Sequence, residues 1–78
     1  MNKGITVEVM RIGTAAKKVA LEEGATVAEA LEVARLSQKE SEIVQVNEDV
    51  VDNDELNSYE LENGDEIILV KNVEGGKV

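Results

Sequence analysis

The sequence contains no cysteine, histidine, proline, tryptophan or phenylalanine, and Tyr59 is its one aromatic residue. Without cysteine and histidine there is no thiolate or imidazole for a zinc site, a cysteine nucleophile, a Ser-His-Asp triad or a disulfide. A metal could be held only by oxygen ligands. The acidic residues do not follow the D-x-[DN]-x-[DN]-G pattern of calcium loops, so we expect no metal site.

Long apolar runs are also missing. No stretch reaches the roughly 18 apolar residues that a membrane-spanning helix needs, and the first residues lack the apolar core of a signal peptide. We therefore expect no membrane association and a cytoplasmic location. A chain of 78 residues, 42% of them hydrophobic, supports one small core. Such a domain offers no evident cleft for acid-base catalysis, so we do not expect an enzyme.

Charge is distributed unevenly along the chain, whose formal net charge is −9. Residues 1–39 carry six basic and five acidic residues, whereas residues 40–78 carry two basic and twelve acidic residues. Because nucleic-acid binding relies on Lys and Arg at phosphates, the acidic half argues against a nucleic-acid ligand. It favours a basic protein partner and a salt-sensitive encounter, or it simply keeps the surface soluble.

The first part of the chain predicts a β-hairpin followed by a helix. Residues 5–12 predict a strand, because Ile5, Val7 and Val9 alternate with the polar residues at 6 and 8. Gly13-Thr14 supplies a turn, and residues 17–21 resume the strand pattern. Thr26 and Glu29 fit a capping box that starts the helix. One helical face is apolar, and it consists of Val27, Ala30, Leu31 and Ala34. We expect this helix to end near Leu36-Ser37.

The second half predicts shorter strands separated by acidic turns. Its expected elements are a strand at 43–47, a turn at Glu48-Asp49, a short strand at Val50-Val51, a helical turn near Leu56, an Asn63-Gly64 turn and a last strand at 66–71. The order predicts an α+β fold with a mixed four- to five-stranded sheet and one helix packed on one face. The first and last strands should lie side by side in its centre. We expect residues 1–71 to form this domain and residues 72–78 a flexible tail.

The alternation also predicts the two faces of the sheet. Six residues should pack under the helix: Val7, Val9, Val44, Val46, Ile67 and Leu69. Five apolar residues would then lie on the opposite face: Met10, Ile12, Ile43, Ile68 and Val70. Such a patch would suit a protein partner, and we take Ile68, Val70, Met10 and Ile43 as candidate partner-binding residues. Alternatively, a loop or the tail covers the patch.

Four segments together resemble the β-grasp, ubiquitin-like fold and, within it, the bacterial ThiS and MoaD sulfur-carrier family. Residues 23–31 are similar to the start of the family's helix, residues 46–51 to its V-N-x-x-x-V strand and turn, and residues 61–67 to its L-x-x-G-D-x-I element. Gly75-Gly76 stands where the family ends. The resemblance covers roughly residues 5–76.

This resemblance implies a carrier protein rather than a catalyst. We expect a monomer without a cofactor of its own. In the family the terminal glycine carboxylate is adenylated by a ubiquitin-activating-like adenylating enzyme and converted to a thiocarboxylate. The sulfur then passes to a sulfur-accepting synthase, in thiazole or molybdopterin synthesis. Carried over to this sequence, the attachment site is Gly76, preceded by Gly75.

The tail itself suits such a role. The five residues from Asn72 to Gly76 reach about 17 Å when extended, and glycines without Cβ fit a narrow channel. The departure is Lys77-Val78, which places Gly76 in a peptide bond, so the carrier role requires a processing protease. The alternative is a ubiquitin-like interaction module that does not conjugate. A third alternative, a designed domain, suits the absence of proline and histidine but not the irregular acidic loop at 47–60.

Overall fold

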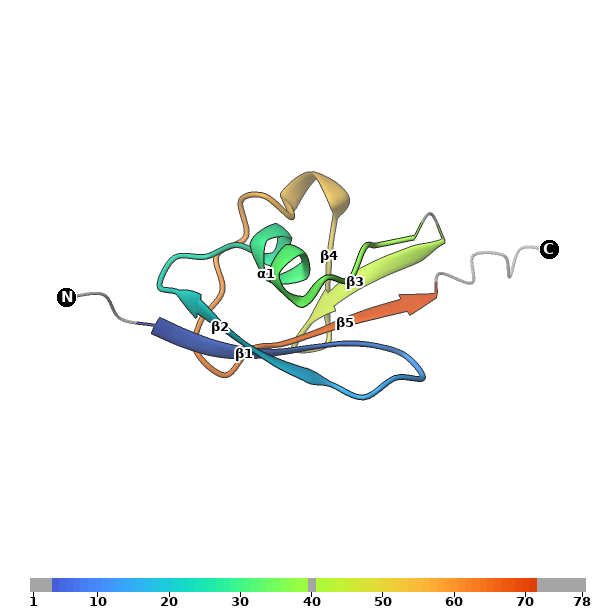
Figure 1. Ribbon diagram of the computed structural model, residues 1–78. Helices are drawn as coiled ribbons and strands as arrows, with labels where there is room; N and C mark the ends of the chain where they lie inside the picture. The colour runs from blue at the N-terminus through green and yellow to red at the C-terminus, as the bar shows by residue number, and fades with distance from the viewer. Residues whose placement is uncertain (1–3, 40, 72–78) are drawn as a thin grey trace.

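The computed structural model describes residues 4–39 and 41–71. Within these ranges the chain forms a five-stranded mixed sheet with one α-helix across one face (Figure 1). The elements are β1 Gly4–Arg11, β2 Lys17–Glu22, α1 Val27–Ala34, β3 Glu42–Val46, β4 Asp49–Val51, the 3-10 turn η1 Asn53–Glu55 and β5 Glu66–Lys71. The predicted α+β β-grasp architecture is confirmed. No helix within these ranges is long and apolar enough to cross a membrane.

The strand order is β2-β1-β5-β3-β4, so the first and last strands occupy the centre, as predicted. β1 and β5 run parallel, with Val9 opposite Ile67, and the other pairs are antiparallel. The turn before β5 is tied directly to β1. The Asn63 Oδ1 accepts the Thr6 N–H at 2.8 Å, and the Gly64 N–H donates to the Thr6 carbonyl at 2.8 Å. These bonds hold the start of β5 beside β1.

The helix begins where the sequence predicts and ends earlier. The Thr26 hydroxyl accepts the Glu29 N–H, and the Glu29 carboxylate accepts the Thr26 N–H, which completes the capping box. The expected end near Leu36-Ser37 is wrong, because Arg35 already adopts a left-handed conformation with φ 61°. The Arg35 N–H reaches the Glu32 carbonyl and the Leu36 N–H the Leu31 carbonyl. This pattern closes helices, usually around glycine.

The turn between β3 and β4 also differs by one residue from its predicted place. Asn47 and Glu48, rather than Glu48 and Asp49, form the turn, and both have positive φ values, 50° and 74°. Two such residues give the twist that suits a tight hairpin. The Asn47 N–H also donates to the Glu66 carbonyl at 2.9 Å, and its Oδ1 accepts the Glu66 N–H. Asn47 therefore fastens this hairpin to β5.

The core lies between the sheet and α1. The six residues predicted to face the helix are each 1% exposed or less: Val7, Val9, Val44, Val46, Ile67 and Leu69. The apolar face of α1 closes over them with Val27, Ala30, Leu31 and Ala34. The predicted inner face of the sheet is therefore confirmed, and the alternate side chains of the same strands point the other way.

Candidate functional site

The four candidate partner-binding residues lie together on the sheet face opposite the helix. Met10, Ile43, Ile68 and Val70 are all half-buried, and they are named here the outer-face patch. Met10 stands opposite Ile68 across the β1–β5 pair, and Ile43 stands opposite Val70 across the β3–β5 pair. The patch is therefore continuous over three neighbouring strands.

Two further apolar residues lie near this patch. Gln45 is the partner of both Ile68 on β5 and Val50 on β4, so Val50 extends the face, and its side chain is 56% exposed. Ile12 was expected on the same face, but β1 ends at Arg11. The Ile12 side chain is 60% exposed and lines a pocket at the end of the sheet. Ile12 therefore lies at the end of the sheet to which the tail is attached.

The diglycine lies outside the described residues, as do Asn72 and Lys77-Val78. What the structure shows is the place on the domain to which the tail is attached. β5 ends at Lys71, at the end of the sheet where β1 also ends and β3 begins (Figure 1). Glu42 is the β3 partner of Lys71, and Ile43 is the partner of Val70. The start of the tail is therefore one residue away from the outer-face patch.

This end of the sheet is braced by an ion pair between β1 and β3. The Arg11 Nε donates to the Glu42 Oε2 at 2.8 Å, and its Nη2 donates to the Glu42 Oε1 at 3.2 Å and to the Ser37 carbonyl at 2.6 Å. The Lys39 N–H also donates to the Glu42 Oε1, at 2.9 Å. The hydrogen bond from Arg11 lowers the pKa of Glu42, and that from Lys39 lowers it further. The ion pair fixes the loop after α1 beside the end of β5.

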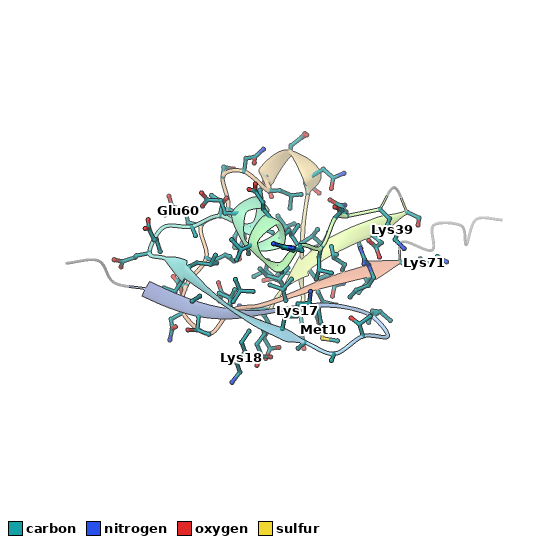
Figure 2. The ribbon with its side chains drawn as sticks, viewed as in Figure 1. Met10, Lys17, Lys18, Lys39, Glu60 and Lys71 are labelled. Carbon is teal, nitrogen blue, oxygen red and sulfur yellow. The ribbon has the colours of Figure 1, made fainter. Side chains whose placement is uncertain are left out.

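Positive charge gathers at this same end of the sheet. A pocket of about 300 Å³ is lined there by Arg11, Lys39 and Lys71, together with Ile12 and the Glu42 carboxylate that pairs with Arg11. Figure 2 shows Lys39 and Lys71 beside each other. We call Arg11, Lys39 and Lys71 the basic tail-exit surface. Sequence reasoning missed this surface, because its three cations are far apart in the chain. The only signal for this surface in the sequence was the concentration of basic residues in the first half of the chain.

Other ligand chemistry finds little support in residues 4–39 and 41–71. No three Asp or Glu side chains of this part of the chain come together as metal ligands. The Arg11–Glu42 pair is its one salt bridge, and no buried side-chain polar atom in it lacks a hydrogen-bond partner. The features that remain for function are therefore the surfaces around the tail and the grooves between elements.

Comparisons with known proteins agree with this geometry. No curated protein sequence matches the chain significantly. Among solved structures six chains match. One, from work described as "Molecular Mimicry of SUMO promotes DNA repair", is 20% identical, covers 87% of this chain and 91% of that chain, and has a TM-score of 0.53. That likeness supports the fold. The ThiS family model matches residues 5–76, so the chain belongs to the ThiS family.

Proposed function

We propose that the protein is a sulfur carrier that is activated at Gly76 and is not itself an enzyme. The observation that carries this proposal is the extent of the family match, which runs through the whole domain and ends at the second glycine, residue 76. The geometry is compatible with it. β5 ends at Lys71, so the five residues 72–76 form the segment that connects the domain to the reacting carboxyl group.

The proposed chemistry needs no side chain of the carrier. A protease hydrolyses the Gly76–Lys77 peptide bond and frees the Gly76 carboxylate. A carboxylate oxygen then attacks the α-phosphorus of ATP in a ubiquitin-activating-like adenylating enzyme, and diphosphate leaves. Hydrosulfide attacks the resulting acyl carbon, AMP leaves, and a thiocarboxylate remains. A sulfur-accepting synthase, such as one for thiazole or molybdopterin, would receive this sulfur.

The outer-face patch and the basic tail-exit surface would dock the adenylating enzyme. Ile68 and Val70 lie on β5 itself, directly before the tail, so a partner that covers them is placed to receive the tail. Lys39 and Lys71 would meet acidic residues of that partner and orient the approach. Half-buried apolar residues beside a charged rim are typical of a protein interface.

The proposal is tested with three versions of the chain: residues 1–78, a form ending at Gly76, and that shorter form carrying Gly76→Ala. Each is mixed with ATP, the cognate adenylating enzyme and sulfide. We expect ATP–diphosphate exchange and the mass gain of an oxygen-to-sulfur replacement for the form ending at Gly76. The 1–78 form should react only after trimming. The Gly76→Ala form should react at least about tenfold more slowly, because the added Cβ displaces the carboxylate.

Intact mass measurement of the protein from its native cell provides an independent test. The proposal requires molecules that end at Gly76. If every molecule retains Lys77-Val78, also when the adenylating enzyme is present, the carrier role is wrong.

A second function, a ubiquitin-like module that does not conjugate, is favoured by the outer-face patch taken with Lys77-Val78. The two functions differ in what Gly76→Ala does. As an interaction module the protein would keep its function with Gly76→Ala and lose partner binding with Ile68→Asp or Val70→Asp. As a carrier it would lose function with all three substitutions.

A further inference from the structure

β2 lies at one edge of the sheet. It pairs with β1 on one side, and no strand among residues 4–39 and 41–71 pairs with its other side. The opposite edge strand, β4, has three residues, whereas β2 has six. Natural sheets commonly keep edge strands short or covered, because their backbone groups can pair with another chain. β2 is therefore long enough to pair with a further strand.

The hydrogen bonds of β1 show which way its backbone groups point. The Thr6 N–H and C=O and the Glu8 N–H all bond to the turn that precedes β5. Because successive residues of a strand direct these groups to opposite sides, the odd-numbered residues of β1 bond to β2. Their partners are odd-numbered as well, since Val7 stands opposite Val19. The odd-numbered residues of β2 are therefore hydrogen-bonded to β1.

The even-numbered residues of β2 direct their N–H and C=O groups away from β1. These residues are Lys18, Ala20 and Glu22, and all three are exposed. The Glu22 carbonyl supports this orientation, because it accepts the Ala25 N–H at 3.0 Å from the turn that follows β2. Backbone groups directed outward at alternate residues are what an added antiparallel strand requires.

The charges of these residues are arranged symmetrically about Ala20. Lys18 and Glu22 each stand two residues from it, on opposite sides. If two copies of β2 run antiparallel with Ala20 opposite Ala20, Lys18 of each copy stands opposite Glu22 of the other. A slip of two residues removes these opposite-charge pairs, and a slip of four places like charges opposite each other. The charges and the backbone groups therefore select the same register.

The two charged side chains have no ionic partner within the described part of their own chain. Across the β1–β2 pair Lys18 stands opposite Glu8, and Glu22 stands opposite Gly4. The one salt bridge of residues 4–39 and 41–71 joins other side chains. Both charges can therefore pair with a second copy.

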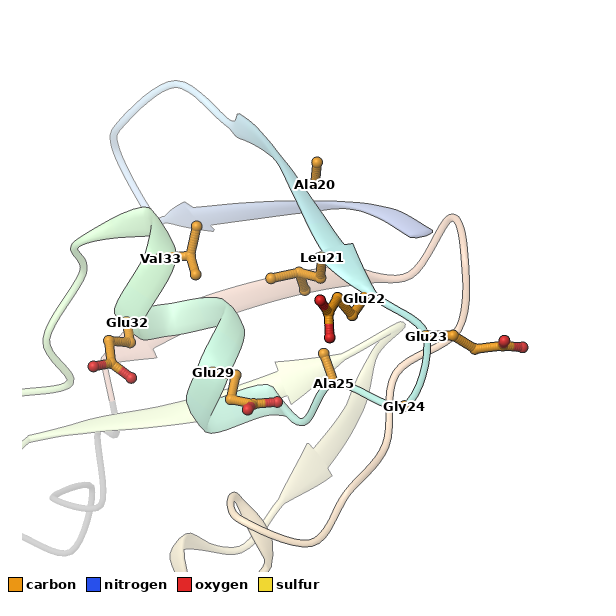
Figure 3. Close-up of a pocket in the computed structure, with 9 residues that line it drawn as sticks. All are labelled: Ala20, Leu21, Glu22, Glu23, Gly24, Ala25, Glu29, Glu32 and Val33. Carbon is orange, nitrogen blue, oxygen red and sulfur yellow. The ribbon is translucent and has the colours of Figure 1, made fainter. Parts of the chain in front are cut away.

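The same register aligns apolar residues at the centre. Ala20 carries only a methyl group, so no large side chain separates the two strands there. Leu21 of each copy would stand opposite Val19 of the other. The Leu21 side chain is half-buried and, with Val33, lines the groove between β2 and α1 (Figure 3). A second copy would remove part of Leu21 from water and add hydrophobic stabilisation.

We infer that β2 is a self-recognition strand, through which two copies of this chain pair antiparallel and form one continuous sheet. The interface is two-fold symmetric, with Ala20 on the axis. A single pair of strands makes a small interface, so the association is weak and the expected monomer prevails in dilute solution. Because β5 runs antiparallel to β2, the two Lys71 residues lie at opposite ends of the joined sheet, and both outer-face patches stay uncovered. This inference does not depend on the proposed carrier chemistry.

The test follows the isotope-labelled 1–78 chain from about 10 μM to about 1 mM, where weak pairing is detected. The mass from sedimentation equilibrium should rise toward that of a dimer. Hydrogen exchange at Lys18, Ala20 and Glu22 should slow by at least about twofold over this range, whereas Val19 and Leu21, already bonded to β1, should change little. A chain that stays monomeric at about 1 mM, or protection that does not alternate along β2, would overturn the inference.

Charge exchange tests the register. Lys18→Glu and Glu22→Lys each place like charges opposite each other and should weaken self-association by about tenfold or more. Glu55→Lys, in the exposed η1 turn, changes the net charge as Glu22→Lys does and should alter the affinity by less than about twofold.

A mixture of the two β2 variants is the decisive sample. The Lys18→Glu and Glu22→Lys chains should pair with each other about as tightly as the original chain pairs with itself, because every facing pair is again of opposite charge. Failure of the mixed dimer to form, or equal effects of Glu22→Lys and Glu55→Lys, would contradict pairing through β2. None of these outcomes bears on the Gly76 reaction.

Discussion

The two faces of the sheet are made by the same strands and differ in how deeply their side chains are buried. On β5, Ile67 and Leu69 face the helix and are completely buried, whereas their neighbours Ile68 and Val70 face the other way and are half-buried. The core requires apolar residues only on the face of β5 that packs against the helix, yet the alternate positions on the other face are apolar as well. The inner face therefore accounts for stability, and we propose that the additional apolar residues of the outer face dock a partner.

The neighbouring isoleucines Ile67 and Ile68 give the most direct test of this difference. Ile67→Ala removes atoms from a fully enclosed site and should lower the free energy of unfolding by about 2–5 kcal/mol. The same change at Ile68 should cost about 1 kcal/mol or less, because that site is partly open to water. Urea unfolding followed by far-UV circular dichroism measures both. Equal losses would mean that something covers the outer face.

The outer face should instead respond in partner binding. Ile68→Asp is expected to lower kcat/KM for activation by the adenylating enzyme by about tenfold or more, because a charge enters the centre of the interface. Thr6→Asp is the matched control, since Thr6 lies on the same face but is exposed and away from the patch. Similar rates for both variants would place the docking surface elsewhere.

A smaller effect is expected at the turn that brings β4 and Val50 to the outer face. Glu48 has φ 74°, so Glu48→Gly should relieve backbone strain and raise the free energy of unfolding by about 0.5–1 kcal/mol. Glu62→Gly is the matched control, because Glu62 is exposed in a turn and is not among the residues with positive φ. That control should lose stability. A loss in both variants would contradict the strained turn.

The smallest effect on stability is expected for the Arg11–Glu42 ion pair, which lies where the inner face of the sheet meets solvent. Arg11 lowers the pKa of Glu42, so the ionised carboxylate stabilises the fold above the ordinary carboxyl pKa. That contribution is lost as the pH falls through the lowered folded-state pKa. Glu42→Gln should therefore be slightly less stable than the original chain at neutral pH and equal to it in acid. A difference that does not change with pH would rule out an ionic contribution.

Local signals in the sequence predicted most of the fold. The capping box at Thr26 and Glu29, the alternation in the strands and the Asn63-Gly64 turn are patterns of neighbouring residues, and each lies where expected. The errors occurred where a residue takes an uncommon conformation. Arg35 ends the helix in a left-handed conformation that glycine usually adopts. Glu48 also has a positive φ, in the β3–β4 turn, where the sequence likewise shows no glycine.

The surfaces around the tail could be predicted only in part. The four residues of the outer-face patch follow from strand alternation, because a period of two places them on one face. Arg11, Lys39 and Lys71 have no common pattern, since they come from β1, the loop after α1 and the end of β5. That β2 lies at an edge is likewise set by no local pattern. Strand order decides which strand is at an edge, and pairing between distant segments sets that order.

The sequence by itself determined the elements, the division of each strand into two faces and the membership of the ThiS family, because these depend on short-range spacing and on ordered motifs. Only the tertiary structure decided that β5 ends, at Lys71, beside Arg11 and Lys39, and that β2 is an edge strand of the sheet formed by the described residues. The physical reason is that hydrogen bonding between strands and packing against the helix bring together residues that no local pattern links.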